Sequence, residues 1–205
     1  MAGRKSDGAT SRAPSLKFTY SVNKVQSYNS KFKVVVMDII VRQTTKEEID
    51  EYFDFFSKSV QALFPEYTEN TRKFFYTNSR ALNKEEILKK IEEGHVVLEA
   101  LVDDKIAGLL IAGKPFGGVS FCHWLMVDPN FQRKGIGTKL LTYWEEIVKE
   151  MGAHNLKLEA IDKNLKFYGD FGFETLGLEK KGSFGTDNYI LRKIIQEPKE
   201  ENYLK

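Results

Sequence analysis

Two glycines that follow an apolar run provide the clearest chemical signal in the sequence. The run ends at Val127, a turn follows, and Gly135 and Gly137 precede an amphipathic stretch that begins at Thr138. This order predicts a strand, a glycine loop and the start of a helix. The first N–H groups of a helix have no partner within it and lie at the positive end of its dipole, so they bind anions. Because glycine lacks a Cβ, a phosphate can approach the backbone of this loop closely.

The residues around the glycines exclude two well-known kinds of anion-binding loop. Arg133 and Lys134 add positive charge beside the loop. The loop is not a dinucleotide-binding fingerprint, because the sixth position of that motif is Leu140 instead of glycine, and it has no Gly-Lys-Ser/Thr of a Walker loop. A tight turn into a helix is the structural alternative for a lone Gly-x-Gly, so the assignment depends on the whole segment.

Residues 120–141 resemble the acetyl-CoA signature of the GNAT N-acetyltransferase superfamily, Q/R-x-x-G-x-G/A. Here the signature consists of Gln132, Gly135 and Gly137, and the family's usual Val-Asp-Pro precedes it at residues 127–129. Residues 164–173 resemble the family's Phe/Leu-Tyr-x-x-x-Gly-Phe helix. The resemblance covers residues 34–195 and implies an α/β fold, a GNAT-like mixed central sheet of about seven strands flanked by helices in a single domain.

The resemblance also implies a function and a set of site residues. The implied enzyme transfers an acetyl group from acetyl-CoA directly to an amine, without a metal ion. Tyr168 would lie beside the CoA sulfur and donate a hydrogen bond or proton to the departing thiolate, whereas core packing is its structural alternative. The family's asparagine, seven positions before this tyrosine, is Ile161 here, and Asn164 either replaces it or only caps the helix. The implied cofactor-binding residues are Leu125, Met126 and Val127 through their backbone, together with Gln132, Arg133, Lys134, Gly135, Ile136, Gly137, Thr138, Asn164 and Tyr168.

The group that accepts the proton from the amine is less clearly marked. Many members of the family carry a carboxylate on the strand before the glycine loop, but residues 119–126 contain none. His123 is the titratable group available there, and a two-residue period would place it on the face of Leu125 and Val127. A structural histidine, a water relay and Asp187 are the alternatives. Cys122 is expected to be a small buried hydrophobe.

Hydrophobic periodicity and cap signals predict the elements that position these residues. Thr45-x-x-Glu48 is a capping box before a helix that Pro65 ends, and Asn83-x-x-Glu86 caps a later one. The first strand, at residues 34–42, is expected to be buried on both faces. The acceptor pocket is expected between the helices of residues 46–93 and the loop 182–187, with Phe55, Phe64, Tyr67 and Phe184 available to line it. The remaining predicted elements are a helix at 71–78, strands at 96–102, 105–114, 119–127 and 156–161, a helix from 138, a short helix at 165–171, and a hairpin of 175–181 and 188–195.

Composition and charge bound the class of protein. Of 205 residues, 41% are hydrophobic, which suits one domain with a substantial core. Residues 1–36 hold seven of the 31 basic residues and one of the 29 acidic ones, so the rest carries 24 basic and 28 acidic side chains. This distribution argues against nucleic-acid binding by the folded part and favours a cationic acceptor. A single cysteine and no apolar run of about 20 residues predict a cytoplasmic protein without a membrane partner.

Three segments are expected along the chain. Residues 1–33 are expected to form a basic extension without stable structure, and a transit peptide or an upstream-start artefact are the alternatives for it. Residues 34–195 are expected to form the acetyltransferase domain. Residues 196–205 are expected to form a charged, loose tail. The expected partners are acetyl-CoA and an amine acceptor, a small molecule or a protein amine, and a homodimer is left open. The alternative function is a non-catalytic acyl-CoA-binding sensor or interaction module.

Overall fold

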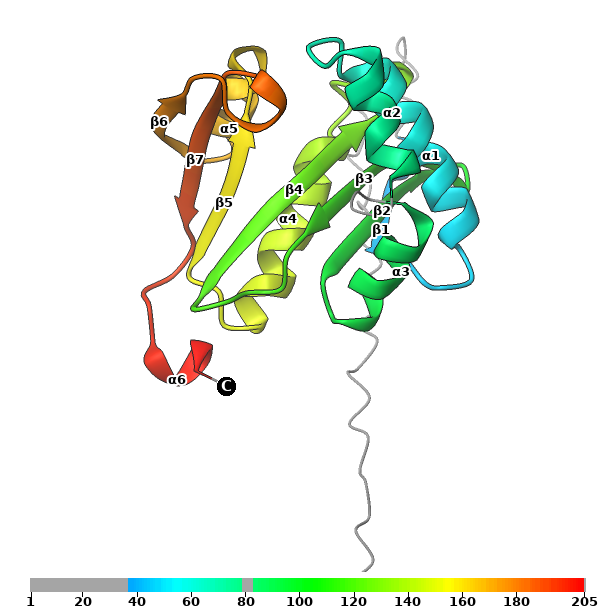
Figure 1. The fold of residues 1–205 in the computed structure, drawn as a ribbon. Coiled ribbons are helices and arrows are strands. Elements are labelled where there is room, and N and C mark those ends of the chain that lie inside the picture. Colours follow the sequence, from blue (N-terminus) through cyan, green and yellow to red (C-terminus); the bar gives the residue numbers. More distant parts are fainter. Residues whose placement is uncertain (1–36, 79–82, 205) are drawn as a thin grey trace, which may run out of the picture.

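The computed structural model describes residues 37–78 and 83–204, so the predictions for residues 1–36 lie outside the described residues. The described part forms one mixed sheet with helices on both faces (Figure 1). The strands are β1 (Ile40–Gln43), β2 (Val96–Val102), β3 (Lys105–Ala112), β4 (Val119–Val127), β5 (Asn155–Ala160), β6 (Glu174–Glu179) and β7 (Asn188–Ile194). The helices are α1 (Ile49–Leu63), α2 (Glu69–Thr77), α3 (Lys84–Glu92), α4 (Ile136–Glu150), α5 (Leu165–Asp170) and α6 (Glu200–Tyr203).

The seven strands lie in the order β1-β2-β3-β4-β5-β7-β6. Every neighbouring pair is antiparallel except β4 and β5, which run parallel. Their pairing is short, from Val119 opposite Asn155 to Cys122 opposite Leu158, although both strands continue beyond it. Figure 1 shows β4 and β5 diverging above this paired segment. The predicted mixed sheet of about seven strands is therefore confirmed.

Each face of the sheet has its own core. Helix α4 packs on one face, because its apolar residues recur at helical spacing and bury Leu140, Leu141 and Trp144. On the opposite face, α1, α2 and α3 stand over the side of the sheet that holds β1 to β3 (Figure 1). This second core is rich in rings, with Tyr52 and Phe56 fully buried. The divergence of β4 and β5 lies in the sheet that separates these two cores.

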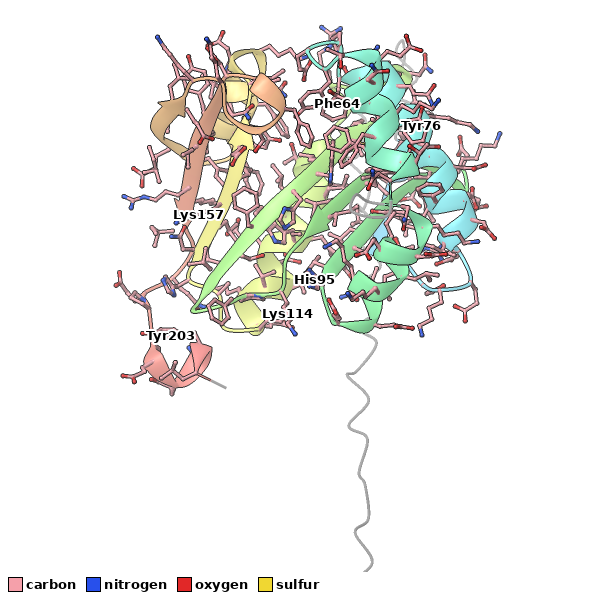
Figure 2. The ribbon with its side chains drawn as sticks, viewed as in Figure 1. Phe64, Tyr76, His95, Lys114, Lys157 and Tyr203 are labelled. Atoms are coloured by element: carbon pink, nitrogen blue, oxygen red, sulfur yellow. The ribbon has the colours of Figure 1, made fainter. Side chains whose placement is uncertain are left out.

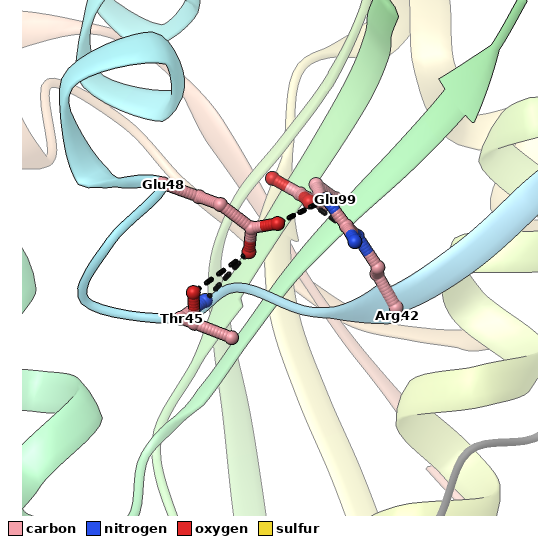
Figure 3. A network of polar contacts seen from close by, with 4 residues as sticks. All are labelled: Arg42, Thr45, Glu48 and Glu99. Atoms are coloured by element: carbon pink, nitrogen blue, oxygen red, sulfur yellow. Dashed lines mark hydrogen bonds and ion pairs between the residues drawn. The ribbon is translucent and has the colours of Figure 1, made fainter. Parts of the chain in front are cut away.

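A network of polar contacts holds the start of α1 to the sheet (Figure 3). The Arg42 guanidinium donates to Glu99 at 2.7 Å and also pairs with Glu48. Glu48 in turn accepts from the backbone N–H and the hydroxyl of Thr45, at 3.1 and 2.9 Å. The predicted capping box is thus half formed, because the Glu48 carboxylate returns to Thr45 while no side chain caps α1. Burial raises the pKa of Glu99, against the opposing effect of Arg42.

The first strand differs from its prediction. Residues 37–39 precede the strand, β1 begins at Ile40, and its residues are half-buried or exposed instead of buried on both faces. The reason is its place in the sheet: among the described residues, β1 is an edge strand that pairs with β2 alone. The predicted run of apolar residues reflected local composition, whereas the burial of a strand depends on what lies beside it.

The C-terminal segment was expected to be loose, and the structure gives part of it defined contacts. It contains α6, whose Tyr203 ring lies 5.6 Å from the His154 ring. Gln196 donates to the Ala153 carbonyl at 2.6 Å. These contacts attach the segment to the turn between α4 and β5, at the end of the sheet opposite the divergence of β4 and β5 (Figure 1). Within the described residues, no helix is long and apolar enough to cross a membrane.

Candidate active site

The glycine loop leads directly into α4, as predicted, although the helix begins at Ile136, two residues before the predicted start. Gly135 has a φ of 87°, a left-handed conformation that glycine adopts without a steric penalty. It occupies the N-cap position, where no side chain caps the helix, and the first turn contains no acidic residue. A Cβ built on Gly135 would meet no atom within 4 Å. The first N–H groups of α4 are therefore left for an external anion.

The polar residues before Gly135 take two different roles. The Gln132 amide donates to the Val127 carbonyl at 3.2 Å and closes the turn between β4 and α4. Arg133, with a φ of 59°, and Lys134 are both exposed. The Lys134 ammonium lies 5.1 Å from the centre of the Phe131 ring. The structure therefore places two exposed cations beside the uncapped helix start, while the Gln132 side chain bonds within the loop itself.

The end of β4 exposes one backbone edge. β3 pairs with β4 as far as Gly108 opposite Val127, but β5 has already left β4 after Cys122. The Asp128 N–H donates to Ala107 in β3, whereas the Val127 carbonyl accepts from Gln132. Since successive residues of a strand direct their polar groups to opposite sides, Leu125 and Val127 direct theirs away from β3.

Met126 differs from its two neighbours in this respect. Its backbone belongs to the set that faces β3, and its side chain is 1% exposed within the core beneath α1. Of the three residues predicted to bind the cofactor through their backbone, two therefore have polar groups directed into the space between β4 and β5. Met126 packs instead of contributing to that edge.

Helix α5 brings Tyr168 close to this space. The Tyr168 side chain is 8% exposed and packs edge-on against Phe167 and Phe173, at 5.0 and 5.9 Å between ring centres. Burial raises the pKa of its hydroxyl, with a smaller effect from Cys122, so the phenol keeps its proton at any physiological pH. The neighbouring Phe167 ring would lie 3.0 Å from a Cβ built on Gly137. The two predicted motifs therefore meet, because Gly137 allows the ring beside Tyr168 to approach α4.

Asn164 lies at the N-cap position of α5, but its side chain makes no capping hydrogen bond there. Its side chain is exposed. Of the two predicted alternatives, the structural one is thus not supported by a contact. The exposed amide is free to take the other role, at the end of β5 that faces the glycine loop.

His123 lies on a different face from the one predicted. Ile111 pairs with Trp124 and Ala112 with Cys122, so His123 is the extra residue of a β-bulge, which interrupts the two-residue period. Its ring lies 5.1 Å from the Phe121 ring. Partial burial, then Lys90, then His95 lower the pKa of His123 to about 4. An imidazole with this pKa is neutral at pH 7 and is a weak base, so it is poorly suited to accept a proton from an ammonium.

The other titratable candidates are engaged elsewhere. Asp187 accepts from the Lys181 backbone N–H at 2.8 Å and shapes the loop before β7. Cys122 is buried, as predicted, and burial raises its pKa to about 12. Its thiol is therefore protonated and is no nucleophile at neutral pH.

A carboxylate that the sequence reasoning missed lies beside the divergence of the strands. Glu159 follows Leu158, the last residue of β5 that pairs with β4, and its side chain is exposed on the face opposite Leu156 and Leu158. Burial, then Glu179, raises the pKa of Glu159. The buried Asn188 amide donates to it through a long hydrogen bond of 3.5 Å. The signal available in the sequence was the alternation of residues 156–160, which places Glu159, like Lys157, on the face opposite Leu156 and Leu158.

The Glu159 carboxylate belongs to a chain of polar side chains. Asn188 accepts from the Thr186 hydroxyl at 3.4 Å, and Thr186 lies within hydrogen-bonding reach of the Tyr67 hydroxyl. Burial, then the Glu66 charge, raises the pKa of Tyr67. The chain runs from β5 through β7 to the loop between α1 and α2. It therefore connects the segment of residues 46–93 with the loop 182–187, the two parts of the chain that were expected to wall the acceptor pocket.

Aromatic rings line the same region. Trp124 on β4 is half-buried and contacts Phe64 edge-on at 5.4 Å. Phe184, in the loop before β7, is 54% exposed and lies 6.0 Å from Tyr67 and 4.8 Å from Phe75. Phe64, Tyr67 and Phe184 are three of the four aromatics expected in the acceptor pocket, and these contacts bring them together. Phe55 packs against the core beneath α1.

Comparison with known proteins agrees with this geometry. The family model described as the acetyltransferase (GNAT) family matches residues 50–173. The chain therefore belongs to the GNAT acetyltransferase family, which confirms the predicted resemblance. An uncharacterised N-acetyltransferase of Methanocaldococcus jannaschii is 26% identical over an alignment of 152 positions that covers 65% of this chain. The matched part spans 60% of that relative's length.

Solved structures show the same fold. The PaiA N-acetyltransferase of Thermoplasma acidophilum, in complex with coenzyme A, is 21% identical with a TM-score of 0.65, over 78% of this chain and 100% of that one. The ribosomal-protein-S18-alanine N-acetyltransferase of Escherichia coli is 16% identical with a TM-score of 0.58, over 79% of this chain and 97% of that one. At these identities the likeness establishes the fold.

Proposed function

We propose that the protein is an acetyl-CoA-dependent N-acetyltransferase that transfers the acetyl group directly to an amine. The observation that carries the proposal is the meeting of an open strand edge at Leu125 and Val127 with the uncapped start of α4 at Gly135. A diphosphate fits the helix start, because a Cβ at Gly135 would meet open space and the exposed Arg133 and Lys134 lie beside it. The extended arm of the cofactor would follow the strand edge.

The residues around the divergence of β4 and β5 supply the chemistry. Acetyl-CoA brings a thioester, whose C–S bond breaks as a C–N bond forms. The N–H groups of Leu125 and Val127 are directed where a carbonyl oxygen can be polarised. Tyr168 donates a hydrogen bond or its proton to the departing sulfur, and its raised pKa keeps the hydroxyl protonated for this task. Glu159 takes the proton of the ammonium, directly or through water, and its raised pKa makes it a better base than an ordinary carboxylate.

The proposal includes a cytoplasmic location, which is supported by the single unpaired cysteine. A small-molecule amine and a protein amine are both acceptors of the required chemistry. The alternative of a sensor that binds acyl-CoA without turnover predicts the same glycine loop. The presence of Tyr168 and Glu159 at the divergence of the strands favours the enzyme, because binding alone needs neither group.

The experiment compares two glycines that share one conformation. Gly135 and Gly94 have φ of 87° and 78°, and a Cβ on either would meet no atom within 4 Å. Valine at either position is strained by about 1–3 kcal/mol, so both variants should melt at similar, lowered temperatures. Only Gly135→Val should lose the rise in melting temperature that acetyl-CoA gives the wild type.

A thiol-release assay over a panel of amines then separates enzyme from sensor. Release of free CoA that depends on an amine supports transfer, and cofactor binding without release supports the sensor. An equal acetyl-CoA response in the Gly135→Val and Gly94→Val variants would overturn the assignment of the glycine loop.

A further inference from the structure

The face of the sheet that carries Glu159 continues below it without a covering helix. Lys157 lies two residues before Glu159 on β5, so the two side chains share a face. Phe121 lies opposite Lys157 in the register of β4 and β5, and the bulged His123 lies beside Phe121. Helices α1 to α3 stand over β1 to β3 and leave this face of β5 and β7 open (Figure 1). A path of exposed or half-buried side chains therefore leads away from the proposed proton acceptor.

Basic residues from four elements lie along this path. Lys90, His95 and Lys114 are linked by their effects on the pKa of His123 or His95, whereas Lys157 is placed by its register opposite Phe121. Lys90 comes from α3, His95 precedes β2, Lys114 follows β3, and Lys157 lies on β5 (Figure 2 labels the last three). The described residues place no carboxylate within 4 Å of the ammonium of Lys90, Lys114 or Lys157. Glu93 lies 3.6 Å from His95 and is the acidic side chain paired with the group. These three lysines therefore have no ion-pair partner among the described residues.

Neighbouring positive charges help to lower the pKa of both His95 and His123. After burial, Lys90 and then His95 lower the pKa of His123. Burial, Lys90 and Lys114 lower the pKa of His95, and Glu93 opposes them. Burial is the larger cause of both shifts, and positive charge beside an imidazole adds to it by disfavouring a further proton. This local excess contrasts with the net acidic charge of residues 37–205.

We propose that this cluster binds the acidic residues of a peptide whose amino terminus is the acetyl acceptor. We define it as the basic strip, and it consists of Lys90, Lys114 and Lys157, with His95 and His123 as neutral neighbours. This inference rests on the proposed function, because it takes Glu159 as the place of the amine.

Strand geometry sets the spacing of the acidic residues. Adjacent strand residues rise about 3.3 Å, so the backbones of Lys157 and Glu159 are about 7 Å apart. An extended peptide has the same rise and directs alternate side chains to one face, so an acidic side chain at its second or at its third position would reach the basic strip. The acceptor is thus an ammonium followed by anions, in contrast to the polycation that the net charge of the domain favours.

The test uses three peptides with the same first residue and with Asp, Asn or Lys at both the second and third positions. For the full-length wild type with acetyl-CoA, kcat/KM should be about tenfold higher for the Asp peptide than for the Asn peptide, and lowest for the Lys peptide. Lys157→Gln should reduce the preference for Asp over Asn by about threefold or more. Lys105→Gln, an exposed lysine at the start of β3, is the control that should keep it.

Two outcomes separate this inference from the proposed function. Equal kcat/KM for the Asp and Asn peptides, or a preference that survives Lys157→Gln, would overturn the basic strip while leaving the acetyltransferase intact. If no peptide is acetylated, calorimetry measures the affinity of the same peptides for the protein saturated with CoA. Tighter binding of the Asp peptide that depends on Lys157 supports the strip without turnover, and equal binding refutes it. Aspartate as a free amino acid distinguishes a small anionic amine from a peptide.

Discussion

Replacing Glu159 by Gln removes the proposed proton acceptor and keeps its shape. The Gln oxygen can still accept from Asn188, so the 3.5 Å contact and the path from Tyr67 are retained. General bases contribute about 10²- to 10⁴-fold to rate. Because the Glu159 side chain is exposed, water can partly replace it, so we expect the lower end. The kcat should fall about 100-fold, a barrier increase of about 2.7 kcal/mol.

The pH dependence and the stability of the same variant sharpen this test. Burial and Glu179 raise the pKa of Glu159 in the folded state, so wild-type kcat should rise with pH as the carboxylate ionises, on a limb above pH 4.5. Glu159→Gln should lack that limb. The sign for stability is opposite: a carboxyl whose folded pKa is raised loses stability as pH rises through its folded pKa. The variant should therefore melt no lower than the wild type at pH 7.

The neighbouring carboxylate supplies the control. Glu179 is exposed on β6, and its charge contributes to the raised pKa of Glu159. Glu179→Gln should move the acid limb of kcat to lower pH and leave the plateau unchanged. Thiol release measured between pH 5 and 9 on the three proteins decides the question. A kcat of Glu159→Gln within twofold of the wild type at every pH would refute the assignment of Glu159 as the base.

Three other predictions concern the hydroxyl, the thiol and the buried ion pair. Tyr168→Phe should lower kcat by about ten- to a thousandfold, a barrier increase of roughly 1.4 to 4 kcal/mol, with little change in acetyl-CoA affinity. Full activity of this variant would show that Tyr168 serves core packing alone. Native Cys122, with its pKa of about 12, should react with a disulfide reagent at pH 8 far more slowly than the unfolded chain, and equal rates would show that it is accessible. Arg42→Ala should cost about 1–3 kcal/mol in urea unfolding because Glu99 is left buried and unpaired, a loss that should grow as pH rises and Glu99 ionises.

Local patterns in the sequence predicted most of the fold. The cap at Asn83 forms as expected, with its side chain accepting from the Glu86 N–H at 2.9 Å, and Gly152 ends α4 with a φ of 92°. These features depend on a few adjacent residues. The predicted burial of β1 was wrong because, in the part of the chain that the structure describes, β1 lies at the edge of the sheet, a position that no property of residues 40–43 records.

The residues of the candidate site show the same difference between local sequence patterns and contacts that form only in the folded chain. Gly135 and Tyr168 belong to contiguous motifs, so their positions could be predicted. The face of His123 could not, because one extra residue in β4 shifts the register against β3 and no glycine marks the bulge. Glu159 was missed because its partners, Asn188 and the more distant Thr186, lie about 30 residues away and meet it only when β5 pairs with β7.

The four-residue pairing of β4 with β5 has a mechanical consequence. It is the place where the sheet's hydrogen bonds pass from β1–β4 to the unit of β5, β6 and β7, so that unit is joined to the rest by a short ladder and by α4 behind it. Amide hydrogens of β5 and β7 should exchange with solvent through a partial opening of lower free energy than that of β2 and β3. A ligand that bridges the divergence would close this opening, so acetyl-CoA should slow amide exchange most strongly in β5 and β7.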